Sequence, residues 1–328
     1  MHLFLQTLTL GLGVALLVGG ATALVEGSVA LARRARIPQI VIGMTVVSLG
    51  TSAPELAVNL SAAIASSAEL VLGNVIGSNI FNTLAVIGGA ALVRPLVISR
   101  RTVGVELPFS VAVSAGLLGL IYAGVPGSGA AAGLSRIDGV LLLGVGVLFG
   151  AYVVRSIRPA LASDNGPDTL LIALSPRVKR VGIAATLVLI GVVTLVFGGR
   201  LVVSSAVAAA GYLEVSPRVI ALSVVAIGTS LPELATSLVA AGRGNTDVAV
   251  GNVIGSNVIN IVLVLGVSVS AAPVVITESV LFELLVNLAA SAVVLAFVRL
   301  GRGRRIVRSE GLVLVASYLA YLFVVLRG

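Results

Sequence analysis

Runs of about 20 apolar residues recur along almost the whole chain, and they restrict its fold more than any other feature. A run of that length lets an α-helix cross the hydrocarbon part of a membrane. The runs lack the in–out alternation of a transmembrane barrel, so helices are favoured. Only 10% of the residues are charged and 58% are hydrophobic, whereas about a quarter of a soluble domain is charged. The predicted fold class is an all-α membrane protein.

Ten transmembrane helices are predicted, separated by polar or basic connections. They cover residues 5–31, 38–65, 69–92, 103–123, 138–157, 182–209, 217–241, 246–269, 279–299 and 310–326. The most polar connection, 158–181, is predicted to be a cytoplasmic linker between two five-helix units, residues 1–157 and 182–328.

Basic residues are distributed unequally between the two sides of the predicted membrane. The connections after the odd-numbered helices hold 17 of the 21 Lys and Arg residues. Since cytoplasmic loops are enriched in these residues, both termini are expected outside. The net charge of +8 comes from short clusters between apolar spans, so no nucleic-acid partner is expected. Short loops and the predominance of Arg over Lys favour a prokaryotic inner membrane.

One polar pattern occurs twice, at a constant offset of 178 residues. "GTSAPE" (50–55) corresponds to "GTSLPE" (228–233), and "GNVIGSNIFN" (73–82) to "GNVIGSNVIN" (251–260). Near-identity at a fixed offset indicates a duplication. Because each unit has an odd number of helices, the second copy would cross the membrane in the opposite direction. The predicted architecture is two inverted repeats, which is typical of secondary transporters with a site at the repeat interface.

The first motif combines a helix break with oxygen ligands. Pro54 has no N–H, so the carbonyl oxygen of Gly50 loses its helical partner. Thr51 and Glu55 share one helix face, and Ser52 lies beside them. Carboxylate, hydroxyl and carbonyl oxygens together suit hard cations such as Ca²⁺ and Na⁺. The second copy offers the same set.

The second motif adds neutral oxygens at helical spacing. Its polar residues recur every four positions, as Asn74, Ser78 and Asn82 and again as Asn252, Ser256 and Asn260. For Asn74 and Asn252, a role in the site and simple helix–helix hydrogen bonding remain equally open.

The charges in the two motifs do not balance. No Lys or Arg accompanies Glu55 or Glu233, and an unpaired carboxylate inside a membrane is costly. Two facing carboxylates require a divalent cation, several monovalent cations or protons. The empty site should therefore not switch its access from one side of the membrane to the other. The remaining acids Glu26, Glu106 and Glu283, and Arg200 within a helix, are interpreted as structural or interfacial.

These motifs resemble the α-1 and α-2 repeats, here 43–83 and 221–261, of the cation/Ca²⁺ antiporter superfamily. The most similar branch is that of the Na⁺/Ca²⁺ exchangers and their prokaryotic relatives, because H⁺/Ca²⁺ exchangers typically carry "GNxxE" where this chain has "GTSxPE". The resemblance implies ten helices as five plus five, no cofactor beyond the transported ions, and a chain that functions as a monomer in the membrane lipid.

The resemblance also implies a role for each motif residue. Glu55 and Glu233 would be the central Ca²⁺ ligands and would also serve Na⁺. Hydroxyl and backbone oxygens would come from Thr51, Ser52, Thr229 and Ser230. Flanking Na⁺ sites would be lined by Ser78 and Ser256 and completed by the carbonyls of Ser48 and Ala226, with Asn82 and Asn260 in the centre. Some relatives carry Asp at the position of Asn260, so the amide argues against K⁺ cotransport. The 158–181 connection is too short for the regulatory Ca²⁺-binding domains of animal exchangers.

The expected function is exchange of Na⁺ for Ca²⁺, in which the first and sixth helices slide against the rest. Three alternatives remain: exchange of H⁺ for Ca²⁺ or for another divalent cation, a passive channel, and an intramembrane enzyme that uses Glu55 and Glu233 as an acid/base pair. The enzyme is the weakest of these, because the chain has one His, no Cys and no metalloprotease motif.

Overall fold

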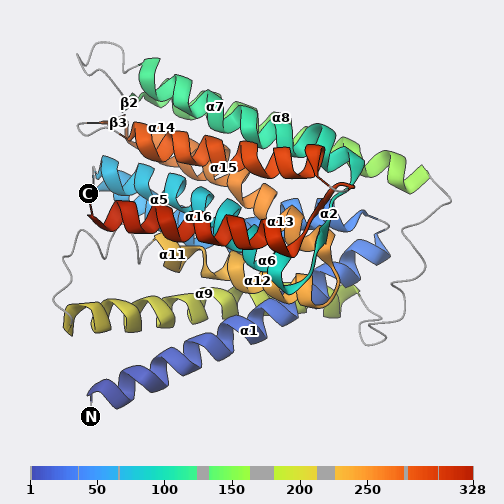
Figure 1. Ribbon diagram of the computed structural model, residues 1–328, viewed down its shortest axis with the longest axis horizontal. Helices are drawn as coiled ribbons and strands as arrows, with labels where there is room; N and C mark the ends of the chain where they lie inside the picture. Colours follow the sequence, from blue (N-terminus) through green and yellow to red (C-terminus); the bar gives the residue numbers. More distant parts are fainter. Residues whose placement is uncertain are drawn as a thin grey trace.

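The computed structural model describes residues 2–35, 37–65, 67–123, 133–162, 181–212, 226–276, 280–301 and 303–327. Within these ranges the regular secondary structure is helical except for two short two-stranded ladders. The helices form an elongated bundle (Figure 1).

The first half contains five predicted spans, and η denotes a π-helical segment. Their elements are α1 (His2–Arg34), α2 (Gln39–Ile42), η1 (Gly43–Val47), α3 (Ser48–Thr51), α4 (Ala53–Ile64), α5 (Ala68–Phe81), η2 (Asn82–Val86), α6 (Ile87–Val93), η3 (Thr102–Glu106), α7 (Leu107–Ala123) and α8 (Arg136–Ala162). Helix α8 extends five residues beyond the expected end at 157, and 163–180 of the predicted linker lie outside the described residues.

The second half follows the same order. Its elements are α9 (Val181–Tyr212), α11 (Ala226–Thr229), α12 (Leu231–Gly242), α13 (Thr246–Ile259), η6 (Asn260–Leu265), α14 (Gly266–Ala271), α15 (Leu281–Leu300) and α16 (Arg308–Arg327).

Eight described helical segments are long and apolar enough to cross a membrane. A ninth span is the broken pair Gln39–Thr51 and Ala53–Ile64, whose axes differ by 48°. The predicted span 217–241 begins outside the described residues, and its described part consists of α11 and α12.

Both helix breaks occur at a serine two residues before a proline. Ser52 has φ −83° and ψ 7°, and Ser230 has φ −89° and ψ 5°, so neither continues the preceding helix. Pro54 and Pro232 then occupy the first turns of α4 and α12, where a missing N–H costs no helical bond. The prolines therefore break each span as the sequence predicted.

Two spans form the centre of the bundle. In the most apolar windows of Leu70–Val93 and Thr246–Ala271, 78% and 83% of the residues are buried, against 39% or less in the other unbroken spans. The outer helices expose large apolar side chains such as Leu148 and Leu189. An exposed apolar perimeter is what a lipid environment requires.

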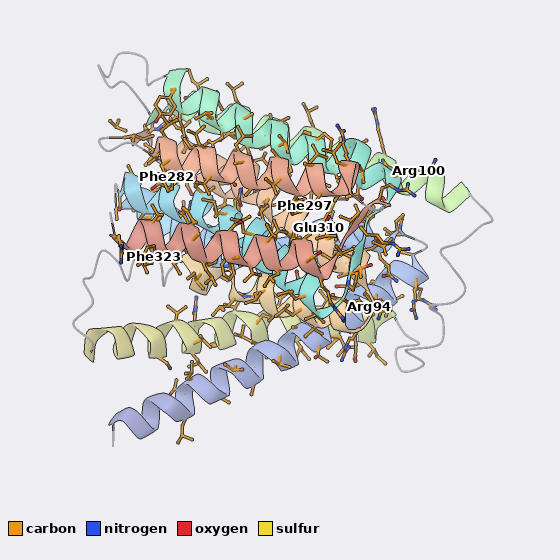
Figure 2. All side chains as sticks on the ribbon, in the orientation of Figure 1. Arg94, Arg100, Phe282, Phe297, Glu310 and Phe323 are labelled. Atoms are coloured by element: carbon orange, nitrogen blue, oxygen red, sulfur yellow. The ribbon has the colours of Figure 1, made fainter. Side chains whose placement is uncertain are left out.

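Two antiparallel ladders connect the halves at opposite ends. Strand β1 (Leu96–Val97) pairs with β4 (Arg305–Ile306), and β2 (Gly133–Leu134) pairs with β3 (Val274–Val275). The first residues of β1 and β3 differ by the same offset of 178. Figure 1 places β2 and β3 at the end that holds both termini, and Figure 2 places Arg94 and Arg100, which flank β1, at the other end. This is the arrangement expected of inverted repeats.

Helices α1 and α9 lie antiparallel along one edge of the bundle (Figure 1). Glycines spaced by seven along α1 meet small residues spaced by seven along α9, with Gly13, Gly20 and Gly27 against Gly198, Gly191 and Ala184. A Cβ atom on Gly20 would lie 2.9 Å from the backbone nitrogen of Leu195 and 3.0 Å from the carbonyl oxygen of Gly191. The two backbones are therefore in direct contact.

This glycine seam gives a prediction with a control in the adjacent residue. Gly20→Ala should destabilise the protein by about 1–3 kcal/mol, because the added methyl group meets backbone atoms that cannot move alone. Gly19→Ala should leave stability unchanged or slightly raised, since a Cβ there meets nothing within 4 Å. Thermal unfolding in detergent measures the stability of both variants. Equal unfolding midpoints would contradict a direct backbone contact between α1 and α9 at Gly20.

Candidate functional site

The two repeated glutamates occupy equivalent buried positions. Glu55 lies in the first turn of α4 and Glu233 in the first turn of α12, and both are 0% exposed. The free N–H groups at a helix N-terminus favour a nearby negative charge. The proline-induced break therefore creates the helix start that stabilises each carboxylate.

Each carboxylate is bonded by the serine of the opposite half. The Oγ of Ser52 donates to Oε1 of Glu233 at 3.0 Å, and the Oγ of Ser230 donates to Oε1 of Glu55 at 3.1 Å. Since each serine is three residues from its own glutamate, these reciprocal bonds bring the two carboxylates to one place at the contact between the halves.

The threonines form a second reciprocal pair. The Oγ1 atoms of Thr51 and Thr229 donate to the Oδ1 atoms of Asn252 and Asn74, both at 3.2 Å. The hydroxyl groups of Thr51 and Thr229 also approach the carbonyl oxygens of Ser48 and Ala226 at 3.4 and 3.3 Å. The carbonyls expected to take part in the site thus lie beside it.

Asn74 and Asn252, whose role the sequence left open, make helix–helix hydrogen bonds. Their Nδ2 atoms donate to Oδ1 of Asn59 at 2.6 Å and to Oγ of Ser237 at 3.1 Å. These bonds fix the amides that receive the threonine hydroxyls. The sequence analysis missed Asn59 and Ser237, although both are polar residues within apolar helices and differ by the repeat offset of 178.

The serines of the second motif differ between the halves. The Oγ of Ser256 donates to Oε1 of Glu233 at 3.2 Å, whereas the Oγ of Ser78 is 3.5 Å from the carbonyl oxygen of Ala226. Ser78 thereby contacts the opposite half and Ser256 its own. Both serines lie within the region predicted for cation binding.

Several buried oxygens in this region have no hydrogen-bond partner among the described residues. They include Oε2 of Glu55, Oε2 of Glu233 and Oδ1 of Asn260, and both side-chain polar atoms of Asn82 are equally unpaired. A buried acceptor without a partner is costly, and a cation would satisfy it. Among the described residues, no hydrogen bond links the side chain of Asn82 to the other predicted ligands.

The oxygen ligands of the candidate site include two carboxylates, and the rest are neutral. Among the described residues, no Lys or Arg pairs with either glutamate, and no three His, Cys, Asp or Glu side chains gather at one place. Two carboxylates surrounded by neutral oxygens suit Ca²⁺ or Na⁺ better than a transition metal.

The other charged groups lie away from these contacts. Glu26 forms a 2.8 Å ion pair with Arg243, and Arg200 is exposed. Glu106 is only 2% exposed and accepts a 2.7 Å hydrogen bond from the hydroxyl of Tyr152, with Arg101 at 3.5 Å. Its interpretation as structural agrees with these contacts.

The family-level comparison decides what kind of protein this is. The sequence model described as "Sodium/calcium exchanger protein" matches residues 5–158 and 183–327. The chain belongs to the sodium/calcium exchanger family. The resemblance seen in the two motifs is therefore confirmed over nearly the whole length.

Relatives within the family match over similar lengths. The putative antiporter CaxA of Alkalimonas amylolytica is 37% identical over 97% of this chain and 98% of its own. The sodium/calcium exchanger MaX1 of Methanosarcina acetivorans is 32% identical over 97% of both. The solved structure of the sodium-calcium exchanger NCX_Mj, from crystals soaked with Na⁺ and Ca²⁺, superposes with a TM-score of 0.78, 30% identity and 97% coverage of both chains.

Family membership makes the chain a multi-pass membrane transporter of cations. The matched relatives are named as exchangers or antiporters, so the prediction that the chain is not an enzyme is confirmed. The alternative of an intramembrane enzyme, with Glu55 and Glu233 as its acid/base pair, is thereby set aside.

Proposed function

We propose that this exchanger moves Na⁺ and Ca²⁺ in opposite directions through one shared site, which is exposed alternately to each side of the membrane. The observation that carries the proposal is the reciprocal bonding of Ser52 to Glu233 and of Ser230 to Glu55. It joins equivalent parts of the two halves around two fully buried carboxylates, each with one free oxygen.

The charge of this site explains why transport is coupled. Two carboxylates balance one Ca²⁺ or at least two Na⁺, and both ions prefer hard oxygen ligands. If the protein switched access without bound ions, both carboxylates would be unpaired charges in a low-dielectric region, at a cost of at least about 2.5 kcal/mol each. Switching therefore requires bound cations, which converts a binding site into an exchanger.

The proposed ligands are the predicted set. Glu55 and Glu233 bind Ca²⁺ centrally. The surrounding oxygens come from Thr51, Ser52, Thr229, Ser230, Ser78, Ser256, Asn82, Asn260 and the carbonyls of Ser48 and Ala226. One chain holds all of these groups, so a monomer suffices.

The proposed topology has ten spans in two inverted repeats, with both termini outside. Both termini lie at one end of the bundle, as an even number of crossings requires (Figure 1). Arg94 and Arg100 lie at the opposite end, which is the cytoplasmic end by the positive-inside rule (Figure 2). A bacterial inner membrane agrees with the relative YrbG of Escherichia coli, an inner membrane protein that is 38% identical over 83% of this chain.

Sodium is proposed as the coupling ion because MaX1 and NCX_Mj are both named sodium/calcium exchangers. The test is ⁴⁵Ca²⁺ uptake by proteoliposomes loaded with Na⁺ and diluted into Na⁺-free buffer. Uptake should require internal Na⁺, saturate with external Ca²⁺ and persist when a protonophore collapses any pH gradient. Uptake driven by a pH gradient without Na⁺ would instead support H⁺/Ca²⁺ exchange, and single-channel currents would indicate a channel.

A further inference from the structure

The two central asparagines, related by the repeat, are held differently. Nδ2 of Asn260 donates to Oδ1 of Asn79 at 3.1 Å. The repeat-equivalent bond would join Asn82 to Asn257, because each pair differs by 178. It is not formed: Oδ1 of Asn257 and both amide atoms of Asn82 have no partner among the described residues.

The backbone carbonyl of Asn257 fixes the orientation of the Asn79 side-chain amide. Nδ2 of Asn79 donates to the carbonyl oxygen of Asn257 at 3.1 Å, and a carbonyl can only accept. Asn79 must therefore present Oδ1 to Asn260, which must in turn offer its own Nδ2. The oxygen of Asn260 then points away from Asn79 in one defined orientation, and it remains buried and unpaired.

A single sequence difference accounts for the asymmetry. Nδ2 of Asn257 donates to Oγ1 of Thr83 at 2.7 Å. The repeat equivalent of Thr83 is Ile261, which has no hydroxyl group to attract Asn79. Thr83 and Asn257 also line a small cavity together with Ser110.

We propose that Asn79 is a positioning residue that fixes the Asn260 oxygen as a preorganised ligand of the transported cation, whereas Thr83 diverts Asn257 and leaves Asn82 mobile. The inference rests on the proposed function, in which both central asparagines face the ions. Preorganised groups bind more tightly because less conformational freedom is lost on binding. The two sides of the central pocket are therefore unequal although their ligand residues are identical.

The first test compares two isosteric replacements at equivalent positions, Asn79→Leu and Asn257→Leu, each of which removes one buried amide. Ca²⁺ binding to the detergent-purified chain is measured by titration calorimetry, and exchange is measured in proteoliposomes. Asn79→Leu should raise the Kd for Ca²⁺ and the half-saturating Ca²⁺ concentration about tenfold, because the free energy of one net hydrogen bond corresponds to a change of about that size. The maximal rate of exchange should stay within about twofold of the wild-type rate. Asn257→Leu should change them less than about twofold. Equal effects of the two variants would overturn the proposal.

A double-mutant cycle tests whether Asn79 acts through Asn260. In an Asn260→Ala background, Asn79→Leu should cost less than about twofold in Kd, because the group it positions is gone. A tenfold cost that persists there would show that Asn79 supports the fold in general, and would contradict a positioning role.

Thr83→Val provides a test that leaves Asn79 intact, should Asn79→Leu fail to fold. Valine cannot accept the amide hydrogen, so Asn257 becomes free to bond Asn82 and fix its oxygen as well. The Kd for Ca²⁺ should fall about threefold; an unchanged or higher value overturns the proposal.

The same measurements separate this inference from the proposed function. A wild-type chain that binds Ca²⁺ but shows no Na⁺-driven uptake would refute the proposed coupling alone, and the ratio of the variants' Kd values would still decide the role of Asn79. A wild-type chain that binds neither cation would overturn both.

Discussion

Replacing Glu233 with glutamine should lower Na⁺-driven Ca²⁺ exchange at least about 100-fold, the largest effect expected of any single substitution. The variant keeps the size of the side chain but removes one of the two charges that balance Ca²⁺. At an effective dielectric constant of about 20, unit charges 4 Å apart attract by about 4 kcal/mol, and about 2.8 kcal/mol already corresponds to 100-fold. Glu55→Gln should have a similar effect, because the two carboxylates are equally buried.

The control for this loss is a buried acid outside the site. Glu106 is 2% exposed and bonded to Tyr152 and Arg101, so Glu106→Gln also neutralises a buried carboxylate. It should retain most of the exchange activity. If Glu106→Gln and Glu233→Gln lost ⁴⁵Ca²⁺ uptake to the same extent, the assignment of the site would be wrong.

Replacing Gly255 with alanine should separate the helices that hold the site. A Cβ atom there would lie 2.5 Å from Oγ of Ser48, 2.6 Å from Cα of Met44 and 2.8 Å from its carbonyl oxygen. Overpacking of this kind costs about 1–3 kcal/mol, and here it would also displace Ser48 from the site. We expect a lower unfolding midpoint in detergent together with a loss of most Ca²⁺ uptake.

An exposed glycine in α7 supplies the control. Among the described residues, a Cβ on Gly116 would meet nothing within 4 Å, and Gly116 is exposed. Gly116→Ala should therefore keep its stability and most of its transport. Equal losses for both variants would show that helix propensity, not the close approach of α13 to η1, sets the effect.

The sequence predicted that Ser52, Glu55, Ser230 and Glu233 lie together because the duplication supplies two copies of the same motif. A single buried Glu, Ser or Thr has several explanations, but Ser52 and Glu55 recur together as Ser230 and Glu233. The predicted odd number of spans in each half then led to the expectation that the copies face each other. In the structure, the two copies meet through the hydrogen bonds from Ser52 to Glu233 and from Ser230 to Glu55.

The sequence could not predict how the central spans deviate from a regular α-helix. The π-helical segments η2 and η6 begin at Asn82 and Asn260, and nothing in their apolar sequences marks a wider turn. Such segments often occur at functional sites. A strict spacing of four selected Asn74, Ser78 and Asn82 but passed over Asn79, whose importance depends on a contact with the other half.

The two strand ladders restrict where this molecule can bend. Each joins a connection of one half to a connection of the other, with one ladder at either end of the bundle. Helices α1 and α9 contribute no residue to them, and their backbones touch each other along the glycine seam. The ladders thus hold the other spans together at both ends, whereas α1 and α9 form a pair that is free to slide along the edge of the bundle. A cross-link between this pair and the spans joined by the ladders should stop transport while leaving the affinity for ions unchanged.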